Sequence, residues 1–271
     1  MNLYEYVSDE ELKTIPISEI FYTIQGEGAL IGRPTVFVRT GGCDFRCAWC
    51  DTLYAVLPEF RHQWPAQNAN QILEKVLDLT RGQPILITLS GGNPALQPLR
   101  ELIEIGRTRG FSFALETQGS VAHDWFSLLD YLVLSPKPPS SQMKWRADRF
   151  AACIEAAQST LAPQSTLGRV EELGKAGPQI SLKIVVFDDA DYQFAREVHT
   201  QFPALPVYLQ VGNPTPALLT LASFDSPAIS PAEQSRERIE WLLECVKRDG
   251  WLDVIILPQL HVLLWGNRRG V

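Results

Sequence analysis

The strongest constraint on the fold is an alternation of short apolar runs with longer amphipathic stretches. The runs are rich in β-branched and aromatic residues, as buried strands are; they comprise residues 34–40, 84–90, 111–117, 131–136, 181–187, 206–211 and 252–258. The stretches between them have the spacing of helices that bury one face; they cover residues 67–80, 95–109, 190–201 and 231–249. Near-continuous apolar strands separated by helices predict an α/β fold with a parallel sheet and outer helices.

Six or seven such units are too few for a complete eight-unit barrel. We therefore expect a truncated, partial parallel barrel, although periodicity alone leaves a doubly wound sheet open. A single domain is expected over residues 1–271, because no linker divides the chain. Residues 53–66, which contain two prolines, are expected to form a loop, and residues from about 138 to 180 an insertion or cap.

Composition excludes several classes of function. The 271 residues carry a formal net charge of −7, so we expect no nucleic-acid or anionic-membrane surface, which would need a basic patch. The sequence contains no run of about 18 apolar residues, so we expect no membrane span. The first residues, MNLYEYVSDEELK, lack the apolar core of a signal peptide. These features predict a cytoplasmic protein.

Three of the five cysteines fall within the stretch GGCDFRCAWCDT, residues 41–52. Cys43, Cys47 and Cys50 have Cys-x3-Cys-x2-Cys spacing, and in a reducing compartment such a group is typical of metal binding or catalysis. The other two, Cys153 and Cys245, lie in apolar, helix-like stretches. A buried free cysteine behaves as a small hydrophobe, so we expect both of them in the core.

The spacing favours an iron–sulfur cluster over zinc. A structural zinc site closes with four Cys or His ligands, and the fourth would have to be His62 in its Pro-bounded loop or a distant His123 or His261. Three thiolates on a four-iron cluster instead leave one iron open to another ligand. The loop follows residues 34–40, at the end of a parallel strand where such sheets bind ligands.

Cys-x3-Cys-x2-Cys with an aromatic residue before the last cysteine resembles the radical S-adenosylmethionine (SAM) superfamily. The resemblance implies a [4Fe–4S] cluster whose open iron is chelated by SAM, which then yields a radical that abstracts hydrogen from the substrate. The motif SGGNP, residues 90–94, resembles the superfamily's GGEP element, with Asn93 in place of the usual acid.

The wider stretch FYTIQGEGALIGRPTVFVRTGGCDFRCAWCDT, residues 21–52, resembles the 7-carboxy-7-deazaguanine synthase family of queuosine biosynthesis. Motifs that match follow in the expected order; they are LETQGS (115–120), LSPKPP (134–139), SLKIVV (181–186) and LPQLHVLLWGNRRGV (257–271). The resemblance implies a homodimeric lyase that converts 6-carboxy-5,6,7,8-tetrahydropterin to 7-carboxy-7-deazaguanine with loss of ammonia. It also implies Mg²⁺ and an electron donor such as a flavodoxin or ferredoxin.

The same resemblance assigns the candidate site residues. Those expected to bind the pterin are Ile24, Gln25, Gly26, Glu27, Arg39, Ser90, His261 and Val271. Those expected to bind SAM are Trp49, Cys50, Asp51, Gly92, Glu116, Ser135 and Lys137, with Lys183 a weaker match. Cys43, Cys47 and Cys50 would hold the cluster and Thr52 the Mg²⁺.

The residue types suit these roles. A glutamine both donates and accepts hydrogen bonds and a glutamate accepts them, as the edge of a pterin requires. An arginine matches a carboxylate with two parallel hydrogen bonds, and Mg²⁺ prefers oxygen ligands.

Two alternatives stay open at this point. A glycyl-radical activase shares the cysteine spacing but acts on a partner protein. A zinc or cluster module that binds partners would need neither Gln25 nor Arg39.

Overall fold

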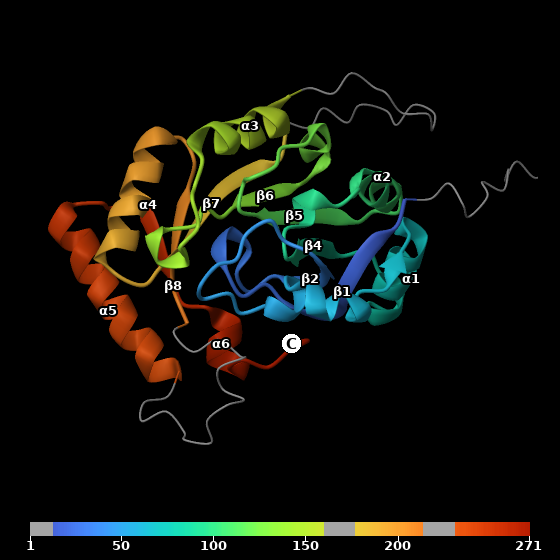
Figure 1. Cartoon of the computed structure of the whole chain (residues 1–271), viewed down its shortest axis with the longest axis horizontal. Coiled ribbons are helices and arrows are strands. Elements are labelled where there is room, and N and C mark those ends of the chain that lie inside the picture. The colour runs from blue at the N-terminus through green and yellow to red at the C-terminus, as the bar shows by residue number, and fades with distance from the viewer. Residues whose placement is uncertain (1–12, 160–176, 214–230) are drawn as a thin grey trace, which may run out of the picture.

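The structure, a computed structural model, describes residues 13–159, 177–213 and 231–271. These residues contain one sheet of nine strands in the order β3-β1-β2-β4-β5-β6-β7-β8-β9 (Figure 1). The strands are β1 Ile15–Ile24, β2 Pro34–Thr40, β3 Ala66–Gln67, β4 Leu86–Gly91, β5 Ser112–Thr117, β6 Tyr131–Leu134, β7 Gln179–Val186, β8 Val207–Val211 and β9 Val254–Leu257. From β2 through β9 every neighbouring pair is parallel. Because the two edge strands, β3 and β9, do not pair with each other, the sheet does not close, and the predicted partial barrel is confirmed.

The sequence prediction missed β1, which pairs antiparallel with both β2 and β3. Its sequence, IPISEIFYTI, contains a proline and alternates polar with apolar residues, unlike the continuous apolar runs of the parallel strands. The sheet is therefore mixed, with two added strands at one edge.

Helices cover the outside of the sheet, as expected (Figure 1). They are α1 Ala69–Leu79, α2 Arg100–Thr108, α3 Ala147–Gln158, α4 Asp189–Gln201, α5 Pro231–Asp249 and α6 Leu260–Trp265. Asn68 and Gln71 form a capping box that begins α1. α2 begins later than residue 95 because Pro94 and Pro98 confine this stretch to a short 3-10 turn first. Residues 53–66 are not a simple loop, since they contain two 3-10 turns and the first residue of β3.

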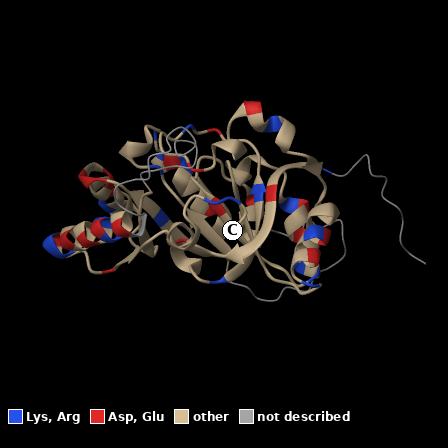
Figure 2. Ribbon diagram, turned by 90° about the horizontal axis from the view of Figure 1, so that it is seen from below, with Lys and Arg blue, Asp and Glu red and all other residues tan. Residues whose placement is uncertain are grey.

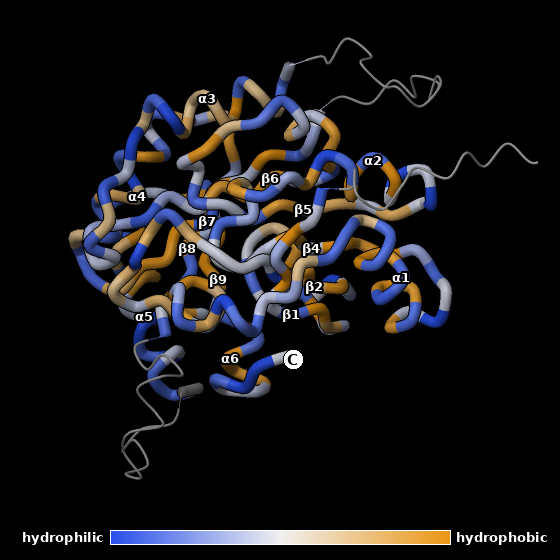
Figure 3. The backbone as a smooth tube through the Cα atoms, turned by 45° about the vertical axis from the view of Figure 1, so that its right-hand side comes forward, coloured by the Kyte–Doolittle hydropathy of each residue, from blue (hydrophilic) through white to orange (hydrophobic). Residues whose placement is uncertain are grey.

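The main core lies between the strands and the outer helices (Figure 3). In β2, Val36 and Val38 are fully buried in this core, whereas Phe37 and Arg39 line a cavity on the other face. β7 alternates in the same way, with Leu182 and Ile184 in the core. This two-residue period places polar residues of otherwise apolar strands on the concave face of the sheet.

Burial confirms the prediction for the two cysteines outside the cluster. Cys153 and Cys245 are both buried in the core, as predicted.

Figure 2 shows most of the charged residues on the outer helices and a few in the interior near the C-terminus. In the part of the chain that the structure describes, no helix is long and apolar enough to cross a membrane.

The described part of residues 138–180 contacts the rest of the molecule at two places. A 3-10 turn, Pro139–Ser141, meets the cysteine loop, where Ala48 N donates to Ser141 O at 3.0 Å. Farther along, α3 buries Phe150 in the core. Residues 160–176 lie outside the described residues, and the assignment of an insertion or cap stays a prediction.

Candidate active site

The three clustered cysteines lie on the loop after β2, at the carboxyl end of the parallel strands. Each is half-buried, and all three line one open cavity on the concave side of the sheet. Cys43 Sγ accepts a hydrogen bond from Phe45 N at 3.4 Å. Within the described residues, no group of three or more His, Cys, Asp or Glu side chains converges on a single metal ion.

Burial raises the pKa of all three thiols, and that of Cys50 to about 11. Lys137 opposes this rise at Cys43 and Cys47, but does not cancel it. Metal ligation requires thiolates and therefore releases these protons. The donor set fits a [4Fe–4S] cluster, because three thiolates would each bind a different iron and leave the fourth iron open to another ligand.

The SGGNP loop after β4 packs directly against the cysteine loop. Gly92 N donates to Thr40 O at 3.1 Å, and Asn93 N donates to Gly42 O at 2.8 Å. A Cβ atom on Gly92 would overlap the carbonyl oxygen of Gly42 and a Cβ on Gly91 that of Thr40. Both glycines therefore permit a close approach between two loops of the chain itself.

A buried lysine that lines the cavity lies between two glutamates. Lys183 Nζ lies 2.5 Å from Glu27 Oε2 and 2.9 Å from Glu116 Oε2. Burial raises the pKa of Glu27, but the charges of Lys183 and His261 lower it more, to about 2. Burial lowers the pKa of Lys183, and the two carboxylates more than reverse that change. Glu27 and Lys183 are therefore both charged at neutral pH.

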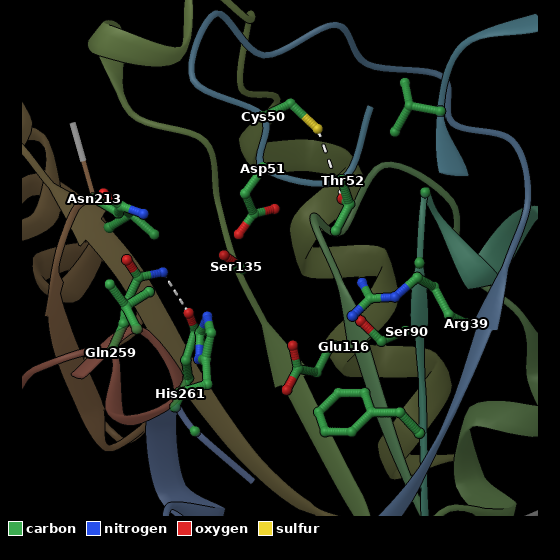
Figure 4. A pocket seen from close by; sticks show the side chains of 18 of the residues that line it. Arg39, Cys50, Asp51, Thr52, Ser90, Glu116, Ser135, Asn213, Gln259 and His261 are labelled. Atoms are coloured by element: carbon green, nitrogen blue, oxygen red, sulfur yellow. Dashed lines mark hydrogen bonds between the residues drawn. The ribbon is translucent and has the colours of Figure 1, made fainter. Parts of the chain in front are cut away.

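Two glutamine side chains extend this ion-paired group. Gln25 Nε2 donates to Glu116 Oε1 at 2.7 Å, and Gln25 Oε1 accepts from Gly26 N at 2.8 Å. Gln259 Nε2 donates to Glu27 Oε1 at 2.6 Å (Figure 4). The other polar atom, Gln259 Oε1, is buried and has no hydrogen-bond partner among the described residues. It is an acceptor beside the pocket, of the kind that a bound N–H group would satisfy.

Arg39 lies in a row of polar residues across three neighbouring strands, opposite Glu19 of β1 and Ser90 of β4. Its Nε is 3.1 Å from Glu19 Oε2, which also accepts from the Tyr54 hydroxyl at 3.0 Å. Burial lowers the pKa of Arg39, whereas Tyr54 and Glu19 raise it, and the net change is upward. Arg39 is thus a fixed cation whose guanidinium points toward Ser90 (Figure 4).

The C-terminal segment folds back to the cavity, so that Val271 and His261 both line it. Arg269 Nε lies 2.9 Å from Glu19 Oε1, and its guanidinium stacks 3.6 Å from the centre of the Tyr54 ring. These contacts tie the tail to the same glutamate that holds Arg39. In Figure 2 the C-terminus lies over the middle of the molecule, away from its outer edges.

The residues predicted to bind SAM come from the ends of four strands, β2, β4, β5 and β6. Lys137 Nζ donates to Ser135 Oγ at 3.0 Å and lies 5.7 Å from the centre of the Trp49 ring. Trp49 Nε1 donates in turn to Ser140 Oγ at 2.9 Å. Asp51 and Thr52 face the same space beside Cys50 (Figure 4). Their oxygen atoms suit Mg²⁺.

All the predicted site residues line this one cavity. Asn93 of the SGGNP motif, to which no site role was assigned, is fully buried and does not line the cavity. Sequence reasoning missed Gln259, Arg269, Glu19 and Tyr54. Of these, Gln259 could have been found, because it lies two residues before His261 within a matched motif.

An open, mainly parallel sheet with a three-cysteine loop after its first parallel strand is typical of the radical SAM class. No family model matches the chain. Among solved structures, QueE from Escherichia coli superposes with a TM-score of 0.62 at 19% identity, covering 94% of this chain and 100% of that one. SuiB from Streptococcus suis gives a TM-score of 0.52 at 13% identity, over 82% of this chain and 47% of that one. These likenesses support the fold.

Sequence similarity gives the family. The 7-carboxy-7-deazaguanine synthase of Bacillus subtilis (strain 168) is 38% identical over 262 residues, which cover 96% of this chain and 99% of that protein. The synthase of Bacillus cereus is 37% identical over 266 residues, covering 96% of this chain and 100% of that protein. The chain belongs to the 7-carboxy-7-deazaguanine synthase family.

Proposed function

We propose that this protein is a radical SAM lyase that converts 6-carboxy-5,6,7,8-tetrahydropterin to 7-carboxy-7-deazaguanine with loss of ammonia. The observation that carries the proposal is the arrangement of one cavity. The loop that carries the three cysteines lies at the carboxyl ends of the strands, and the polar side chains of Gln25, Glu27 and Arg39 line the same cavity. When bound, the cluster and SAM would supply the radical that abstracts hydrogen; the chain's own residues bind and orient the reactants.

The polar groups divide by charge in a way that suits this substrate. Arg39, with Ser90 beside it, is a buried cation at one side of the cavity and would bind the substrate carboxylate. Glu27 is ionised and accepts from Gln259 Nε2, while Gln25 donates to the neighbouring Glu116. The oxygen atoms of Glu27, Gln25 and Gln259 would bind the N–H groups of the pterin. His261 and Val271 would close the pocket from the C-terminal segment.

The opposite side of the cavity suits the cofactors. Cys43, Cys47 and Cys50 would hold the cluster. SAM would lie between the cysteine loop and the strand ends; the residues we propose to bind it are Trp49, Cys50, Asp51, Gly92, Glu116, Ser135 and Lys137. Thr52 would bind Mg²⁺ through its hydroxyl. An electron donor such as a flavodoxin or ferredoxin and a homodimeric assembly complete the proposal.

The test is an anaerobic reaction of the reconstituted protein with SAM, a reductant, Mg²⁺ and the carboxytetrahydropterin, followed by mass spectrometry. We expect a 7-carboxy-7-deazaguanine peak that disappears in Cys47→Ala. Cys245→Ala is the matched control, because Cys245 is buried in the core away from the cavity, and it should keep the product. Formation of 5′-deoxyadenosine without that product would reject the substrate. Product formation by Cys47→Ala would reject the role of the cluster.

A further inference from the structure

The loop after β4 carries an asparagine at 93, where the superfamily element has an acid. Asn93 is fully buried, and its side chain does not face the cavity. It lies where the SGGNP loop, the cysteine loop and the end of β5 meet, since its partners come from all three. A ligand contact is therefore not what its side chain makes in this chain.

Every polar site of the Asn93 amide is used. Its Nδ2 donates to Asp44 Oδ1 and to Ser120 Oγ, each at 3.0 Å. Its Oδ1 accepts from Thr117 Oγ1 at 2.8 Å and from Ala95 N at 3.2 Å. An ionised acid could accept both of the latter bonds, but it has no hydrogen to donate to Asp44. The two donated bonds thus require an amide at this position.

The bond to Asp44 reaches the cysteine loop directly. Asp44 follows Cys43, and the same Oδ1 atom accepts from Gln118 Nε2 at 2.6 Å. Gln118 Nε2 also lies 3.8 Å from Cys43 Sγ. The backbone adds a parallel bond, from Asn93 N to Gly42 O at 2.8 Å. Two side-chain amides from neighbouring strand ends therefore converge on the first turn of the loop.

We propose that Asn93 is a positioning residue: through Asp44 it fixes the start of the cysteine loop in the shape that binds the cluster. The inference rests on the proposed cluster site and is independent of the identity of the substrate. It reassigns position 93 in this chain from a group that touches a ligand to one that holds the loop. It also accounts for an asparagine here, because an acid would oppose the carboxylate of Asp44.

The test compares three variants. Asn93→Asp removes the donor and sets two carboxylates together. Ser120→Ala is the matched control, because Ser120 accepts from the same Nδ2 atom at the same distance but lies outside the cysteine loop. The double variant Asn93→Asp/Asp44→Asn exchanges the two groups, so that the amide at 44 can donate to the carboxylate at 93 while Gln118 still has its acceptor.

Two readouts follow the loop itself. Hydrogen exchange of the amides of residues 42–52 is measured on the iron-free chain, and the rate of iron loss to a chelator is measured on the reconstituted protein. For Asn93→Asp we expect both rates to rise about tenfold or more, as for a lost charge-assisted hydrogen bond. Ser120→Ala should change them less, and the exchanged pair should restore them toward wild type.

Three results would overturn the proposal. They are wild-type exchange and iron retention in Asn93→Asp, equal losses in Asn93→Asp and Ser120→Ala, and no recovery in the double variant. If Asn93→Asp fails to fold, the double variant decides: a folded, iron-retaining double variant supports the inference and an unfolded one refutes it. Hydrogen exchange needs neither iron nor substrate, so failure of the proposed reaction remains distinguishable from failure of this inference.

Discussion

Replacing Lys183 by methionine tests the role of the buried ion pairs most directly. The substitution keeps the volume of the side chain but leaves Glu27 and Glu116 without a cation, although both are nearly enclosed, with side-chain exposures of 13% and 14%. A charge-assisted hydrogen bond contributes about 1.5–3 kcal/mol, and breaking a buried pair costs about 3–5 kcal/mol. We expect the free energy of unfolding to fall by about 4 kcal/mol at pH 8.

This loss should depend on pH in a defined direction. In the wild type the pKa of Glu27 is lowered to about 2, so its stabilising contribution is fully present above its ordinary value of about 4.3 and is lost only as the pH falls toward 2. Without Lys183, burial would raise the pKa of Glu27 above that ordinary value. Its contribution is then present at low pH and is lost as the pH rises, so the variant should be less impaired at pH 5 than at pH 8.

Thermal unfolding measures both effects. The unfolding entropy of a chain of 271 residues is about 0.6 kcal/mol/K, so the expected loss lowers the Tm by about 7 °C at pH 8. Lys75→Met is the matched control, because Lys75 is exposed on α1, and it should leave the Tm nearly unchanged. Lys183→Arg keeps the charge and should keep the pH dependence of the wild type. An equal loss at pH 5 and pH 8 in Lys183→Met would refute the reasoning.

Three further predictions concern the cavity. Arg39→Lys removes the planar fork, so the KM for the carboxypterin should rise about tenfold or more with a smaller change in kcat; an unchanged KM would contradict a carboxylate contact. Thr52→Ala should raise the Mg²⁺ concentration for half-maximal rate, whereas Thr52→Ser keeps the hydroxyl and should not; equal effects would exclude a hydroxyl ligand. Gly92→Ala should increase iron loss to a chelator, because the added Cβ meets Gly42 O; wild-type retention would show that the loops can separate.

The sequence predicted the parallel strands well because each is a nearly continuous apolar run, and burial on both faces requires that pattern. Polar residues that interrupt these runs, such as Arg39, Glu116 and Lys183, then mark the concave face, since side chains alternate along a strand. The same logic failed for β1, which lies between β3 and β2, pairs antiparallel with both and lacks a continuous apolar run. An expectation built only on βαβ units has no place for such a strand.

The partners of these residues were harder to predict, because a hydrogen bond between distant strands leaves no local pattern. Gln25 and Glu116 are 91 positions apart, and Gln259 and Glu27 are 232 apart. The motif match indicated which side chains reach the cavity, but not that one lysine pairs with two of them. Lys183 was the weakest match, yet it contacts both glutamates.

Asn93 shows why a motif position and a role must be separated. Gly92 was expected to bind SAM, but the backbone atoms that Gly91 and Gly92 approach belong to Thr40 at the end of β2 and to Gly42 in the cysteine loop. Once two loops pack this closely, the residue that follows is enclosed between them, and each of its polar atoms must find a partner inside the protein. With Asp44 as one of those partners, the enclosed residue must donate as well as accept. The neighbouring carboxylate therefore selects an amide at 93, through a contact that the SGGNP motif does not contain.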